Sequence, residues 1–65
     1  MESGEKVRLR AYGGGEIVRR VVKVEGPTVL VCREEEYTKA EREGREPTAV
    51  GFPAQAVIGV QPSGA

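Results

Sequence analysis

Apolar and charged residues alternate strictly near the start of the chain, over residues 6–11. Val7, Leu9 and Ala11 share one side, and charged residues occupy the other. This period of two is typical of a half-buried β-strand. Three glycines follow at 13–15, and successive glycines permit the positive φ values of a tight reversal. The pattern predicts a first strand that ends in a hairpin-like turn.

The next segment, residues 16–25, is a longer run of strand-forming residues whose apolar phase changes. Ile17 and Val21 fall on odd positions, whereas Val22 and Val24 fall on even ones. A strand cannot change phase without a bulge or bend. We therefore predict a long second strand that bends near Val21 and serves both halves of a folded-over sheet.

A turn, a third strand and a helix follow. Gly26-Pro27 is a strong turn signal. Residues 28–33 predict a third strand, because the run before Arg33 is rich in β-branched and apolar residues, as in a strand that is covered on both faces. Residues 34–43 are good helix formers that begin with three glutamates, and Gly44 is a natural cap for the last turn. The sequence predicts a charged, solvated helix of about ten residues that lies loosely against the strands.

The end of the chain carries two more short apolar segments. Residues 48–52 predict a fourth strand, a single helical turn begins at Pro53, and residues 56–60 predict a fifth strand. We expect one domain over residues 6–60, between a flexible N-terminus at 1–5 and a flexible tail at 61–65.

The strand order and the segment VGFPAQAVIGV at residues 50–60 resemble the SH3-like small β-barrels. That family commonly shows a glycine, an apolar residue, a proline, small polar residues and a closing valine here, which residues 51–57 match. The resemblance implies a mainly β fold: a five-stranded SH3-like barrel with one short helix between the third and fourth strands. Family members bind proline-rich peptides through an aromatic groove with tryptophan. This chain has no tryptophan, so the resemblance does not extend to that groove.

The same ending is similar to the plasmid-borne, trimethoprim-insensitive dihydrofolate reductases, which are also SH3-like barrels. Phe52-Pro53 matches their aromatic-proline pair, and Ala56-Val57 matches the turn that follows. Their pore depends on a Val-Gln-Ile-Tyr run, where this chain has Ala-Val-Gly-Phe at residues 49–52. The resemblance therefore implies a shared fold and not the reaction.

Composition narrows the possible chemistry. The chain has 65 residues, no histidine, and ten basic against ten acidic residues. Without histidine the usual catalytic triad is impossible, and the single cysteine, Cys32, permits neither an internal disulfide nor a plausible zinc site. We expect Cys32 to be a small buried apolar residue, and we expect no cofactor, no metal and no enzymatic activity. No segment is apolar and long enough to cross a membrane, and the charged N-terminus predicts a cytoplasmic protein.

The best candidate surface is a basic stripe on the first two strands. Residues 1–33 hold seven Lys/Arg against four Glu, and residues 34–65 hold three against six. If the hairpin register brings the basic residues together, they form a stripe that tracks phosphates, with an aromatic ring at its end for base stacking. The candidate residues are Arg8, Arg10, Tyr12, Arg19, Arg20 and Lys23.

Two functions stay open from the sequence. The first is a small non-catalytic binding or assembly module that associates with itself or with another protein. A domain this small cannot easily bury all the apolar residues of its strands, and association covers the remainder. The alternative is a nucleic-acid-binding module that uses the basic stripe. Neighbouring glutamates, such as Glu16 and Glu25, could neutralise that stripe by cross-strand pairing.

Overall fold

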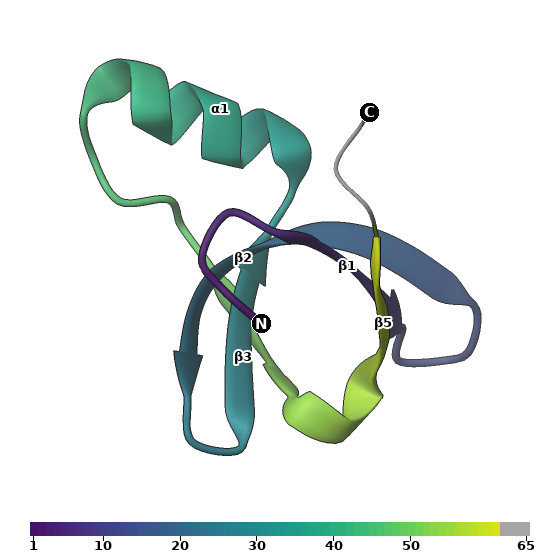
Figure 1. Cartoon of the computed structure of the whole chain (residues 1–65). Helices are drawn as coiled ribbons and strands as arrows, with labels where there is room; N and C mark the ends of the chain where they lie inside the picture. Colours follow the sequence, from purple (N-terminus) through teal and green to yellow (C-terminus); the bar gives the residue numbers. More distant parts are fainter. Residues whose placement is uncertain (62–65) are drawn as a thin grey trace.

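Five antiparallel strands form a single sheet, and one helix lies outside it (Figure 1). The computed structural model describes residues 1–61. Its elements are β1 (Lys6–Arg10), β2 (Glu16–Glu25), β3 (Thr28–Cys32), α1 (Glu34–Glu43), β4 (Val50–Pro53), the 3₁₀ turn η1 (Ala54–Ala56) and β5 (Val57–Gln61). The strands are ordered β4-β3-β2-β1-β5. The mainly β class and the helix between the third and fourth strands are therefore confirmed.

The alternation in β1 places its valine and leucine in the core. Val7 and Leu9 are fully buried, whereas Arg8 and Arg10 are exposed. The buried residues of four strands meet on the inner face of the curved sheet, as expected when one face of each strand is apolar. This core contains Val7, Leu9, Val21, Val29, Val31 and Phe52, with Ile17, Ala54, Ala56 and Val57 packed against it.

The predicted bend in β2 is present as a β-bulge. Val21 pairs with Val31, but the next ladder pair is Lys23 with Leu30, so Val22 is an extra residue. The bulge changes which side of the strand faces inward. It explains why apolar residues continue on even positions after Val21, and it lets β2 pair with both β1 and β3.

The triple glycine makes the turn between β1 and β2. Gly13, Gly14 and Gly15 have φ values of 88°, 98° and 81°, a region that side chains with a Cβ rarely adopt. The Ala11 N–H donates to the Gly15 carbonyl at 3.0 Å, which closes the loop.

The helix begins and ends where the sequence predicts. Gly44 ends it in the left-handed conformation, with φ 69°, and the Arg45 N–H donates back to the Ala40 carbonyl at 3.0 Å, as in a Schellman cap. Only Ala40 is fully buried on the helix. Most of α1 is therefore exposed, and it projects from one end of the sheet (Figure 1).

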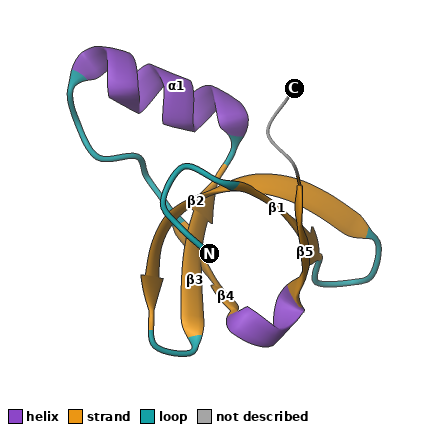
Figure 2. Cartoon of the chain, viewed as in Figure 1, coloured by secondary structure: helices purple, strands orange, loops and turns teal. Residues whose placement is uncertain are grey.

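The sheet is not a closed barrel, which corrects the closed form expected from the sequence. β4 and β5 are the two edges, and within residues 1–61 no ladder joins them; η1 carries the chain from one to the other (Figure 2). Closing a barrel requires hydrogen bonds between the two edge strands of the sheet. β4 has four residues and ends in Pro53, which has no N–H to contribute.

The last two strands are displaced from their predicted limits. β4 begins at Val50, because the Thr48 N–H is bonded at 2.8 Å to a carboxylate oxygen of Glu36 rather than to β3. β5 extends to Gln61, one residue beyond the predicted domain end. The remaining tail residues, 62–65, lie outside the described part.

Candidate binding surfaces

The strand register sorts the candidate basic residues onto two faces. Residues directly opposite one another in an antiparallel pair share a face. Arg19 lies opposite the buried Val7, so it belongs to the inner face, whereas Arg20 lies opposite Lys6 on the outer face. The exposed Arg8 alternates with Val7 along β1 and shares the outer face.

Arg20 is held by three partners within the fold. Its Nε and Nη2 donate to the two carboxylate oxygens of Glu34 at 2.9 and 3.1 Å, and Nη1 donates to the Gly4 carbonyl at 2.6 Å. Its guanidinium also lies 4.8 Å from the centre of the Tyr37 ring. The hydrogen bond with Glu34 raises the pKa of Arg20 and lowers that of Glu34. Arg20 therefore fastens β2 to the N-terminal segment and to α1.

Two other members of the predicted stripe have carboxylate partners. Arg8 pairs with Glu16 at 3.4 Å, and Lys23 pairs with Glu25 at 3.2 Å. Arg10 has no ion pair among residues 1–61. The cross-strand neutralisation that the sequence left open is thus realised at Arg8, whereas the neighbouring Arg10 keeps its charge free of an ion pair within the described residues.

Tyr12 is directed toward the core rather than the outer face. Its ring stacks on Phe52, with ring centres 5.3 Å apart and planes at 17°. Tyr12 is nevertheless 76% exposed, so much of its surface faces solvent at the end of β1.

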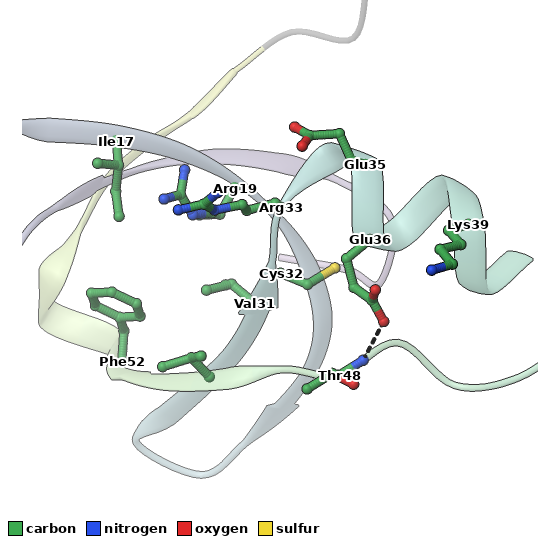
Figure 3. Close-up of a pocket in the computed structure, with 11 residues that line it drawn as sticks. Ile17, Arg19, Val31, Cys32, Arg33, Glu35, Glu36, Lys39, Thr48 and Phe52 are labelled. Atoms are coloured by element: carbon green, nitrogen blue, oxygen red, sulfur yellow. Dashed lines mark hydrogen bonds between the residues drawn. The ribbon is translucent and has the colours of Figure 1, made fainter.

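A pocket opens on the inner face, between the sheet and the start of α1 (Figure 3). Its volume is about 540 Å³, within the range of about 300–1,000 Å³ that is usual for small-molecule sites. The lining residues are Ile17, Arg19, Val31, Cys32, Arg33, Glu35, Glu36, Lys39, Thr48, Val50 and Phe52. Cys32 is buried, as predicted, and burial raises the pKa of its thiol.

Some charged groups of the pocket have ion-pair partners and others do not. Glu36 accepts from Arg45 Nη1 at 2.7 Å and from the Thr48 N–H at 2.8 Å. Both hydrogen bonds lower the pKa of Glu36, to about 2, and the bond from Arg45 has the larger effect. Arg19 and Arg33 have no ion pair in the described part of the chain. Among residues 1–61, the hydrogen bond of the Arg19 side chain runs from Nη1 to the Val18 carbonyl, at 2.8 Å.

The opening between the two edge strands uncovers part of the apolar inner face. Val50 lies opposite the buried Val31 and is 60% exposed, and Val60 lies opposite the buried Val7 and is 49% exposed. These valines continue rows of core residues toward the edges β4 and β5, which no further strand of the described part covers. β5 also carries Ile58, an extra residue at a bulge, which is 39% exposed.

Several of these residues were not identified from the sequence. Arg33, Val50 and Val60 become candidates only because the sheet is open and because α1 lies beside the pocket. Arg19 could have been separated from Arg20, because it shares the odd phase of Ile17 and Val21 in β2.

Comparisons with protein-family models, with curated proteins and with solved structures found no match for this chain. Within residues 1–61, no helix has the length and apolar character that a membrane crossing requires. In the same range, no three histidine, cysteine, aspartate or glutamate side chains group as metal ligands would.

Proposed function

We propose that the chain is a non-catalytic assembly module, an open variant of the SH3-like small barrel that pairs with a second copy through β5. The observation that carries the proposal is the edge of β5. Within residues 1–61 this edge is unpaired on one side, and β5 has no charged residue and exposes Ile58 and Val60.

The element order supports the SH3-like part of the proposal. β1 lies between β2 and β5, β2 is long and bent, and a 3₁₀ turn precedes the last strand. These features agree with the resemblance carried by residues 51–57. Because no ladder joins β4 to β5 within residues 1–61, the proposal is for an open form of that barrel.

The edge of β5 supports association of two copies. Unpaired backbone groups on an edge strand are a template for another strand, and proteins that avoid such pairing place charges or proline there. β5 reads VIGVQ and has neither. Pairing two β5 strands in antiparallel fashion satisfies both edges with a single two-fold contact, and it covers Val60.

A non-catalytic role is consistent with the state of one carboxylate of the pocket. Glu36 lines the pocket and is bound by Arg45, and its pKa is lowered to about 2, whereas a general acid at neutral pH needs a raised pKa. The alternative, a nucleic-acid-binding module, has less support. Arg8, Arg20 and Lys23 already have carboxylate partners, which reduces the charge available to phosphates.

Light scattering coupled to size-exclusion chromatography tests the proposal over a range of concentrations. We expect the wild-type chain to form a dimer whose population rises with concentration, and Val60→Lys to be monomeric, because a lysine on an edge opposes strand pairing. Val18→Lys is the matched control. Val18 is 43% exposed on β2, which has a partner on both sides. A wild-type chain that is monomeric at every concentration, or equal behaviour of the two variants, contradicts the proposal.

A further inference from the structure

We infer that the inner-face pocket binds a small organic carboxylate with an apolar body. The inference rests on two arginines that have no carboxylate partner among residues 1–61 and that line a cavity with an apolar floor (Figure 3).

Arg19 is an unusual residue for its position. It occupies an inward position of β2, between Ile17 and Val21, and its ladder partner Val7 is fully buried. Charged side chains next to an apolar core are rarely left without a partner of opposite charge. The carbonyl of Val18, which accepts from Arg19, leaves most of the guanidinium donors free.

Arg33 brings a second guanidinium to the same pocket. It immediately precedes α1, at a position where no side chain caps the helix. Both arginines are labelled within the pocket in Figure 3, and both line it. Guanidinium groups match the geometry of a carboxylate, because each can donate two parallel hydrogen bonds to its oxygens.

The charge of the pocket favours an anion. Lys39 is the third cation of the lining, and Glu35 and Glu36 are its two carboxylates. Glu36 is already paired with Arg45, so the three cations face one lining carboxylate, Glu35, that has no ion pair among residues 1–61. A carboxylate ligand balances part of this positive charge.

The floor of the pocket favours an apolar body on that anion. Ile17, Val31, Val50 and Phe52 line it, and Val50 is 60% exposed in the structure. Covering this surface with a hydrocarbon chain removes apolar area from water. Charge and floor together select an amphipathic carboxylate over a simple anion or a neutral apolar molecule.

Sodium octanoate is a suitable probe, and its binding can be followed by isothermal calorimetry and by NMR shifts of the backbone amides. Acetate supplies the carboxylate without the apolar body, and octanol supplies the apolar body without the charge. We expect saturable octanoate binding, with shifts around Arg19, Arg33 and Val50. We expect acetate and octanol each to bind weaker by about tenfold or more.

Variants separate this site from general charge attraction. Arg19→Gln and Arg33→Gln are each expected to weaken octanoate binding by about tenfold, the effect of one lost charge-assisted hydrogen bond of about 1.4 kcal/mol. Arg10→Gln is the matched control, since Arg10 is exposed on β1 and lines a different cavity. Circular dichroism confirms that each variant is folded.

Val50→Asp is a second test that leaves both arginines intact. It places a negative charge at an exposed position of the floor, and we expect it to weaken octanoate binding and to leave the fold unchanged. Three results would overturn the inference: no saturable octanoate binding, octanol binding as tightly as octanoate, or Arg10→Gln weakening binding as much as Arg19→Gln.

Discussion

Replacing Arg20 by alanine should destabilise the domain, because this arginine joins three parts of the chain. The change removes the two-pronged ion pair with Glu34, the hydrogen bond to the Gly4 carbonyl and the contact with the Tyr37 ring. The ion pair is partly exposed, so it contributes about 0.5 kcal/mol after solvent screening. The carbonyl bond and the ring contact add about 1 kcal/mol and about 0.5 kcal/mol.

The expected loss of about 2 kcal/mol is large for a chain of this size, whose total free energy of unfolding is about 3–10 kcal/mol. It corresponds to a fall in Tm of about 10 °C. Urea unfolding followed by far-UV circular dichroism measures the loss directly. Arg20→Lys should recover less than half of it, because an ammonium group cannot bind both Glu34 oxygens in the same plane.

Arg10→Ala is the matched control for this measurement. Arg10 is exposed on the outer face and has no ion pair among the described residues, so its loss should change the free energy of unfolding by less than about 0.5 kcal/mol. If Arg20→Ala and Arg10→Ala are equally stable, Arg20 does not fasten the fold. In that case Arg20 is free to contribute to the basic stripe, and the stripe becomes a stronger candidate for a phosphate-binding surface.

Three further variants probe the core, the acid response and the helix cap. Leu9→Ala creates a cavity at a fully buried position and should cost about 3 kcal/mol or more, whereas Ile58→Ala should cost less than about 1 kcal/mol; equal urea midpoints would contradict the core assignment. Because the pKa of Glu36 falls from 4.5 to about 2 on folding, its contribution is complete above pH 4.5 and is lost as the pH falls toward 2. Glu36→Gln should therefore flatten the acid side of a stability profile, and superimposable profiles would argue against this pairing. Gly44→Ala places a Cβ at φ 69° and should cost about 1 kcal/mol in a urea titration; an unchanged midpoint would refute the strained cap.

Local patterns predicted the elements well. The helix bounds followed from three glutamates at its start and from Gly44 after its end. The bulge in β2 followed from the phase change after Val21. These features are determined by neighbours in sequence, through backbone propensity, capping and alternation, and they need no knowledge of the distant chain.

The open edge and the pocket required the three-dimensional arrangement. Whether the two edge strands, β4 and β5, pair depends on the length of β4 and on the path of η1, which no local pattern specifies. The partner of Arg20 was likewise hidden, since Glu34 is 14 residues away in sequence. The helix places that carboxylate beside β2 only after the sheet has formed.

Pairing of β5 with a second copy is tested most directly by amide hydrogen exchange of residues 57–61 at low and high protein concentration. In the separate chain, the β5 amides that do not pair with β1 are open to solvent and should exchange quickly. We expect these amides to become protected as the concentration rises, with no comparable change in the amides of β3. Exchange that stays rapid at every concentration would contradict association through this edge.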